Sequence, residues 1–123
     1  MALHEINLDV DKDRDFITRR LAIDFIGRIE ANKFSTLDII TKKLAYLGLS
    51  TDKEHKPKLK QELIELYLEL KDLCEDSIKM ASSMLGLWRE TFTADDVKAL
   101  QETLDDGKDG ADRCADRIEQ LRR

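Results

Sequence analysis

The chain has 123 residues, of which 38% are charged, 6% are aromatic and one is proline, so its composition fits one helical domain better than a β-rich one. Its formal net charge of −5 comes from 26 acidic and 21 basic residues, which argues against general nucleic-acid binding. No apolar run reaches the ~18 residues of a membrane span, so we expect a cytoplasmic protein without a membrane helix.

The first residues, 1–10, alternate weakly between apolar and polar side chains, which is compatible with a flexible arm or a short strand. A first helix is predicted over residues 13–32, because acidic residues favour its start and apolar residues then recur at helical spacing. The residues expected to face inward are Phe16, Ile17, Leu21, Phe25, Ile26 and Ile29.

The segment that follows carries a helix-start signal. Ser35 is a good N-cap, Asp38 lies at the third helical position, and Phe34 can pack on Ile39 across the cap. The sequence therefore predicts a second, separate helix over residues 36–47. Its inward-facing residues would be Leu37, Ile40, Leu44 and Leu47.

A third and longer helix is predicted over residues 57–89, with Pro57 in its first turn. Apolar or small residues recur there in alternating steps of 4 and 3: Leu59, Leu63, Leu66, Leu70, Leu73, Ser77, Met80, Met84 and Leu87. A second apolar stripe lies beside the first: Ile64, Tyr67, Cys74, Ile78, Ala81, Leu85 and Trp88. Because a surface helix needs one apolar face only, we expect this helix to lie between two partners.

A fourth helix is predicted over residues 94–122, with Thr93 as its N-cap, Asp96 at the third helical position and Phe92 packing on Val97. Its apolar seam is narrow: Val97, Leu100, Leu104, Gly107, Ala111, Cys114, Ile118 and Leu121. Placed antiparallel to the third helix, this seam meets the first stripe layer by layer. Within it, residues 105–110 contain two glycines, so both a continuous helix and a loop remain open there; the unbroken seam favours the helix.

These elements predict a single all-α domain over residues 1–123. Its architecture would be an antiparallel helical bundle of four helices, with a long coiled-coil-like hairpin formed by the third and fourth. The helices over 13–32 and 36–47 are too short to cover the third helix. We therefore expect a second copy of the chain to cover the remainder, as a homodimer.

The residues that could carry chemistry are few. Cys74 and Cys114 lie on buried stripes about one turn apart, which predicts two free, packed thiols rather than a disulfide. His4 and His55 are isolated in the sequence, and no pairing of cysteine with histidine has the spacing of a metal site. The sequence therefore predicts no catalytic residues, metal or cofactor, and a protein that is not an enzyme.

The remaining candidate is an acidic stripe on the third helix, formed by Glu62, Glu65, Glu69, Asp72 and Asp76. It has three interpretations: a solvated face, a docking surface for a basic partner, or a Mg²⁺ site for phosphate chemistry. The solvated face is favoured. The metal site is the weakest, because all five acids lie on one helix and no second set faces them.

Two further features concern partners. Lys53, Lys56, Lys58 and Lys60 form a basic cluster without interleaved aromatic residues, so nucleic-acid binding is not expected. Trp88 at the far end of the third helix is a candidate partner-binding residue, together with the acidic stripe. The expected function is therefore a non-enzymatic protein–protein interaction module, such as a regulator, an inhibitor or immunity protein, or an assembly protein. The alternative is a metal-dependent phosphate or nucleotide hydrolase.

Overall fold

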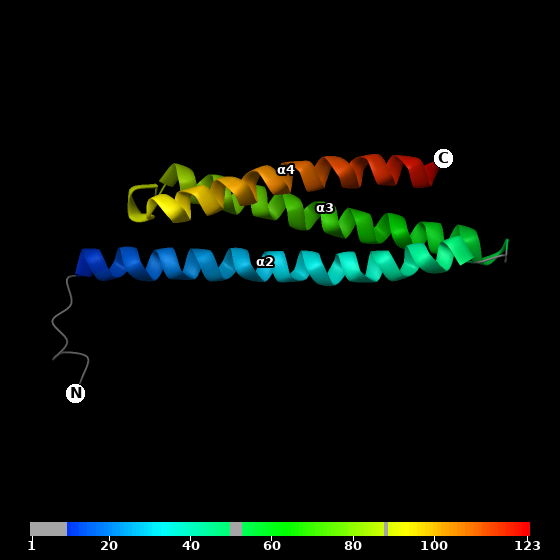
Figure 1. The fold of residues 1–123 in the computed structure, drawn as a ribbon, viewed down its shortest axis with the longest axis horizontal. Coiled ribbons are helices and arrows are strands. Elements are labelled where there is room, and N and C mark those ends of the chain that lie inside the picture. Colours follow the sequence, from blue (N-terminus) through cyan, green and yellow to red (C-terminus); the bar gives the residue numbers. More distant parts are fainter. Residues whose placement is uncertain (1–9, 50–52, 88) are drawn as a thin grey trace, which may run out of the picture.

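The computed structural model describes residues 10–49, 53–87 and 89–123, and these residues form three long helices (Figure 1). Helix α2 spans Val10–Leu49, α3 spans His55–Leu87, and α4 spans Ala94–Arg122. A short 3-10 helix, η1, spans Arg89–Thr91 between the last two. The described residues contain no strand, so the predicted all-α class is confirmed.

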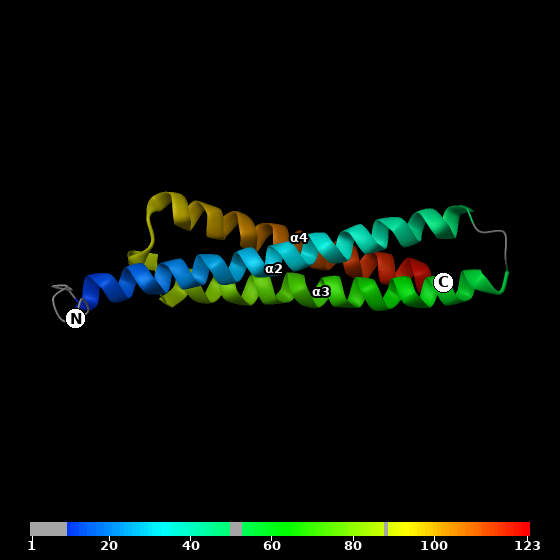
Figure 2. The ribbon, with the colours of Figure 1, turned by 90° about the horizontal axis from the view of Figure 1, so that it is seen from below.

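Successive helices run antiparallel, and α3 is the element that joins the other two (Figures 1 and 2). It packs extensively against α4 to form the predicted hairpin, and it also packs against α2. Few backbone positions of α2 and α4 lie close together, although side chains of both helices take part in the same apolar clusters. The molecule is therefore an elongated three-helix rod in which the backbones of α2 and α4 stand apart.

The prediction of four helices is wrong, because residues 13–32 and 36–47 belong to one continuous helix, α2. Its buried and half-buried residues recur in steps of 4 and 3 straight through the expected break: Ala22, Ile26, Ile29, Lys33, Thr36, Ile40, Lys43 and Leu47. Breaking the helix there would leave several backbone N–H and C=O groups without helical partners, and no glycine or proline in residues 28–47 favours such a break. The Ser35 cap signal is too weak to compete.

Several residues of α2 face a different way from the prediction. Leu21 is 64% exposed and Phe25 is 51% exposed, although both were expected to face inward. Leu37 and Leu44 are also exposed, whereas Ile40 is buried as predicted. The expected contact across the cap does not exist either, since Phe34 and Ile39 are both exposed. The two separate helices would each have turned their own apolar face inward, and the single helix fixes one common face.

The α3–α4 hairpin agrees with the sequence pattern. The Thr93 hydroxyl accepts a hydrogen bond from the Asp96 backbone N–H, and the Asp96 carboxylate accepts one from Thr93 N–H, so the capping box is present. Helix α4 continues through residues 105–110 without a loop. A Cβ placed on Gly110 would lie 2.8 Å from Cys74 Sγ, so α4 approaches α3 closely at this level.

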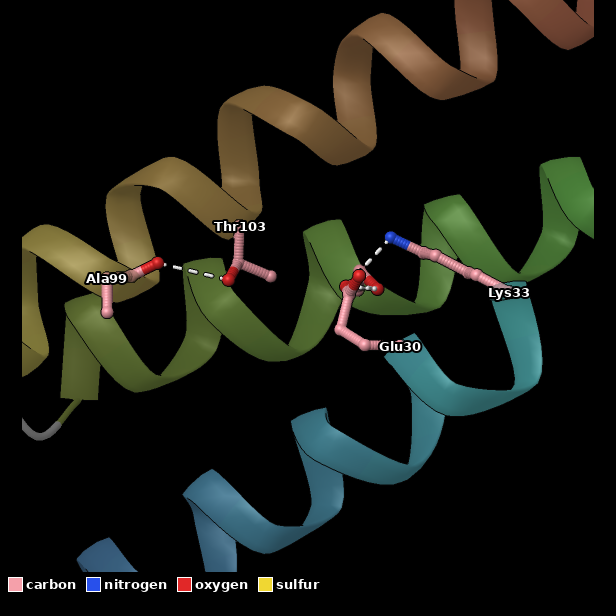
Figure 3. Close-up of polar contacts among 5 residues, drawn as sticks. Glu30, Lys33, Ala99 and Thr103 are labelled. Carbon is pink, nitrogen blue, oxygen red and sulfur yellow. Dashed lines mark hydrogen bonds and ion pairs between the residues drawn. The ribbon is translucent and has the colours of Figure 1, made fainter. Parts of the chain in front are cut away.

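The core is divided into two apolar clusters along the rod. The first contains Ala22, Ile26, Ala81, Met84, Leu85, Phe92 and Leu100. The second contains Ile40, Leu63, Ile64, Tyr67, Cys114 and Ile118. Between them lies a polar layer, in which Glu30 accepts hydrogen bonds from Lys33 Nζ at 2.9 Å and from the buried Ser77 hydroxyl at 3.2 Å (Figure 3). This layer ties the middle of α2 to α3 in one register.

The arm expected over residues 1–10 lies outside the described residues as far as residue 9, and so does Trp88. Within the described helices, none has an apolar stretch of the length that a bilayer crossing requires.

Candidate functional site

Helix α2 keeps most of the exposed apolar surface of the described structure. Apart from Leu68 and Leu87 on α3, all large apolar side chains that remain exposed lie on α2: Leu21, Ile23, Phe25, Phe34, Leu37, Ile39, Leu44, Tyr46 and Leu49. Phe34 is 68% exposed, and it lies in the middle of the helix rather than at an end. A helix that is apolar on several sides is normally buried on several sides. The buried residues of α2 lie along one seam, which packs mainly against α3 and also joins Leu100 of α4 in the first core cluster.

One side of α2, which we call the α2 flank, faces the open space beside α4. It consists of Ile23, Gly27, Glu30, Phe34, Leu37, Thr41 and Leu44, in alternating steps of 4 and 3. Four of these side chains are large and apolar, and all four are exposed. The flank directly adjoins the buried seam of α2, so its apolar side chains are held on a packed element rather than on a loop.

The space beside this flank is a groove with α3 as its floor. In its central part, Phe34 and Leu37 form one wall, and Gly110 and Arg113 of α4 form the other. Tyr67, Leu70 and Cys74 of α3 lie at the bottom, and the hollow measures about 400 Å³. A second hollow, beside Leu44, shares Tyr67 and Arg117 with it, and a third lies beside Ile23 between α2 and α4. We call these three hollows together the open groove.

The α4 side of the open groove, which we call the α4 wall, is polar and has its charges sorted along its length. It consists of Asp96, Ala99, Thr103, Asp106, Gly110, Arg113, Arg117 and Gln120, again in alternating steps of 3 and 4. The acidic residues come before Gly110 and the basic residues come after it. The groove therefore combines one apolar wall with one wall that is acidic at one end and basic at the other.

The acidic stripe predicted on the third helix lies elsewhere, on α3. Glu65, Glu69, Asp72 and Asp76 are exposed to solvent. Glu62 is half-buried, and its Oε2 accepts a hydrogen bond from Lys43 Nζ of α2 at 2.8 Å. This hydrogen bond lowers the pKa of the Glu62 carboxyl below its usual value, with smaller contributions from the charges of Lys43, Lys58 and His55. Glu62 thus serves to join α2 to α3.

The structure adds two arginines to the basic cluster that the sequence predicts at the start of the third helix. Lys53, Lys56 and Lys60 lie around a hollow of about 540 Å³ together with Arg122 and Arg123 from the end of α4. The arginines are distant in sequence, and the antiparallel hairpin brings the end of α4 to the start of α3. All five side chains are exposed, as expected for a solvated basic end.

The two cysteines are free and buried, as the sequence predicts, and both line the central hollow of the open groove, Cys74 from α3 and Cys114 from α4. Burial raises the pKa of the Cys74 thiol. It also raises the pKa of Cys114 to about 11, and the neighbouring Cys74 adds to this shift. Both groups are therefore protonated thiols near neutral pH, and poor nucleophiles. Over the residues that the structure describes, no group of three or more His, Cys, Asp or Glu side chains is placed to hold a metal ion.

No protein-family model matches the chain, and no curated protein or solved structure shows a significant match to it. Any functional conclusion therefore rests on the residues themselves. The sequence prediction chose the acidic stripe and Trp88 and missed the α2 flank. The signal that could have found it was the presence of apolar residues on more than one side of residues 21–46, a pattern that was assigned to two inward faces.

Proposed function

We propose that the protein is a non-enzymatic interaction module that binds another protein through the open groove between α2 and α4. The observation that supports this most is the row of exposed apolar side chains on the α2 flank, with Phe34 at its centre. Covering apolar surface contributes about 25 cal/mol per Å². Contiguous exposed apolar surface with a polar border is typical of protein-binding sites.

The polar surroundings of the flank support a protein partner rather than a small ligand. The groove consists of three hollows spread along the rod, whereas a small-molecule site is a single pocket that encloses most of its ligand. An amphipathic helix laid along the groove would place apolar residues against Phe34 and Leu37 and polar residues against the α4 wall. A role as a small regulator, inhibitor or assembly protein fits such a surface. The two free, buried thiols are compatible with the reducing cytoplasm as its location.

The alternative function, metal-dependent hydrolysis by the acidic stripe, has no observation in its favour. One of its five acids, Glu62, is engaged with Lys43. The exposed remainder lies on a single helix, α3. A rise of several degrees in melting temperature with millimolar Mg²⁺, lost in Glu65→Gln/Asp72→Asn, would support that alternative instead.

The proposal is tested by placing charges on the α2 flank. Leu37→Asp/Leu44→Asp changes two exposed side chains of the groove, and Ala31→Asp/Ala45→Asp is a matched control on the exposed side of α2 away from α3. We expect both variants to remain helical by circular dichroism. Bound protein, measured by quantitative affinity capture with the purified variants as baits, should fall at least about tenfold for the first variant only.

Equal capture by the wild-type chain and by Leu37→Asp/Leu44→Asp would overturn the proposal. Equal loss in both double variants would do so too, because the effect would then follow from added negative charge rather than from the groove.

A further inference from the structure

We propose that the occupant of the open groove is a second copy of this chain, docked antiparallel so that α2 lies along α2 and α4 lies along α4. This inference rests on the proposed interaction function and names the partner. It is carried by two residue patterns on different helices, which have the same two-fold symmetry and the same centre.

The first pattern is on the α2 flank, which is self-complementary about Phe34. When the flank is paired antiparallel with itself, Phe34 meets Phe34 of the second copy, and Ile23 meets Leu44 at each end. Gly27 then meets Thr41, and Glu30 meets Leu37. The large apolar residues are thus paired at the centre and at both ends, and a small residue opposes Thr41 between them. An isologous dimer requires such a self-complementary surface.

The second pattern is on the α4 wall, which is self-complementary about Gly110. In the antiparallel pairing, Asp106 meets Arg113 of the second copy, and Arg113 meets its Asp106. Further out, Thr103 meets Arg117, and Ala99 meets Gln120. The two charged layers nearest the centre therefore join opposite charges. Parallel packing would instead bring each charge against its own kind.

The two centres lie at the same level of the rod. Phe34 and Gly110 line the same central hollow from opposite sides. The ends agree as well, because Ile23 shares a hollow with Ala99 and Leu44 shares one with Gln120. One rotation of 180° therefore satisfies both patterns together. It places the hollow beside Ile23 of one copy over the hollow beside Leu44 of the other.

The shape of the open face is also compatible with this rotation (Figure 2). With α3 at the bottom of that view, α4 stands higher than α2 near the start of α4, and α2 stands higher near its own end. A second copy, rotated by 180° so that the two open faces meet and the helices run antiparallel, places each raised segment over the lowered segment of the same helix in the first copy.

The size of this face is sufficient for a stable dimer. From Ile23 to Leu44 the groove is about 30 Å long, and two helices side by side are about 20 Å wide. The face thus covers about 600 Å² in projection, and interdigitating side chains increase the accessible area that is buried. Specific interfaces bury about 800 Å² on each partner.

Cross-linking tests the arrangement directly. Phe34→Cys should form an intermolecular disulfide under mild oxidation, whereas Ala31→Cys, on a different face of the same helix, should not. Native Cys74 and Cys114 are present in both variants and are buried, so they serve as a common background. A mixture of Ile23→Cys and Leu44→Cys should give the mixed dimer, and neither variant alone should cross-link, because only an antiparallel pair brings these positions together.

Charge reversal tests the α4 contact by an independent measurement. Arg113→Glu would place like charges opposite each other twice, and we expect it to raise the dimer Kd, measured by sedimentation equilibrium, at least about tenfold. Lys108→Glu changes the net charge equally on an exposed position away from the groove, and should change the Kd less than about threefold. Asp106→Lys/Arg113→Glu should restore the wild-type Kd to within about threefold.

The outcomes separate this inference from the function on which it rests. The antiparallel dimer is overturned if the chain stays monomeric up to about 0.5 mM. It is also overturned if Ile23→Cys cross-links with itself rather than with Leu44→Cys. The proposed function then still stands or falls by the capture experiment with Leu37→Asp/Leu44→Asp. If that variant captures as much protein as the wild-type chain, both proposals are overturned.

Discussion

At Gly107, an added Cβ would lie 2.9 Å from Ile78 Cγ1 and 3.1 Å from the backbone oxygen of Cys74, whereas one at Gly27 would meet nothing within 4 Å. Both glycines are inside helices, so alanine would favour the helical backbone at each. At Gly107 the gain in helical stability from alanine is outweighed by steric strain, because the carbonyl of Cys74 is part of α3 and cannot move aside.

We therefore predict opposite changes in stability for two identical substitutions. Gly27→Ala should raise the free energy of unfolding by about 0.5–1 kcal/mol. Gly107→Ala should lower it by about 1–2 kcal/mol, because the tight contact with α3 is lost or strained. Urea denaturation followed by circular dichroism measures both. An unchanged or raised midpoint for Gly107→Ala would contradict the close approach of α4 to α3.

Because burial raises the pKa values of the two cysteine thiols, we predict that the free energy of unfolding falls at alkaline pH. Cys114 has a pKa of about 11 in the folded chain, above the ordinary value of 9.0 that applies when it is unfolded. Above about pH 9 the unfolded state loses this proton while the folded state keeps it, so unfolding becomes more favourable as pH rises toward 11. The free energy of unfolding of the wild-type chain should fall across this window.

The control for this prediction is Cys114→Ala, which removes the titrating group. It should be less stable than the wild-type chain at pH 8, because a buried side chain is shortened. Its stability should, however, decline less between pH 9 and 11. Parallel declines of the two proteins would mean that other groups, such as lysines, cause the whole effect.

At the scale of the helix, α2 offers neighbouring isoleucines with opposite environments. Ile40 is 1% exposed against α3, and Ile39 is 45% exposed. Ile40→Ala should lower the free energy of unfolding by about 2–5 kcal/mol, since it leaves a cavity in the second core cluster. Ile39→Ala should change it by less than about 1 kcal/mol. Equal effects, measured by thermal unfolding of both variants, would show that α2 is rotated about its axis relative to this structure.

The sequence was a good guide where the apolar pattern is narrow and a poor one where it is broad. In α4, one seam and one capping box around Thr93 allow a single helix position, and both the start and the pairing with α3 were predicted correctly. In α2, apolar residues lie on several sides, and the true seam contains Lys33 and Lys43. Lys33 pairs with Glu30 of the same helix, whereas the partner of Lys43 is Glu62 of α3, which only the tertiary structure reveals.

The candidate site was missed for the same physical reason. The sequence shows which residues are apolar, but exposure of Phe34 depends on how α2 turns about its axis. In the observed rotation, Ile26 and Ile40 enter the two apolar clusters and Glu30 accepts a hydrogen bond from Ser77 of α3. The open groove also needs α2 and α4 to stay apart on α3, which no local pattern encodes.

At the scale of the whole molecule, the helices should differ in local stability. α3 has packing partners on two sides, whereas α2 packs mainly on α3, through a seam that includes Lys33, Thr36 and Lys43. In the Arg113→Glu variant, used to weaken self-association, amide hydrogens of α2 should exchange at least about tenfold faster than those in the middle of α3. Hydrogen exchange read out by mass spectrometry distinguishes this from uniform exchange, which would indicate that all three helices unfold as one unit.

The position of α2 ahead of α3 in the chain has a consequence during synthesis. Translation adds about 5–20 residues per second, so completing α3 after Leu49 takes several seconds, while a helix forms in about a microsecond. During that interval α2 has no intramolecular helix on which to bury Ile26, Ile29 or Ile40. On a polysome, neighbouring nascent chains display the same segment at high local concentration. Pairing of copies through the α2 flank while they are still attached to ribosomes would cover that flank but not this seam, so the seam stays exposed to aggregation until α3 is complete.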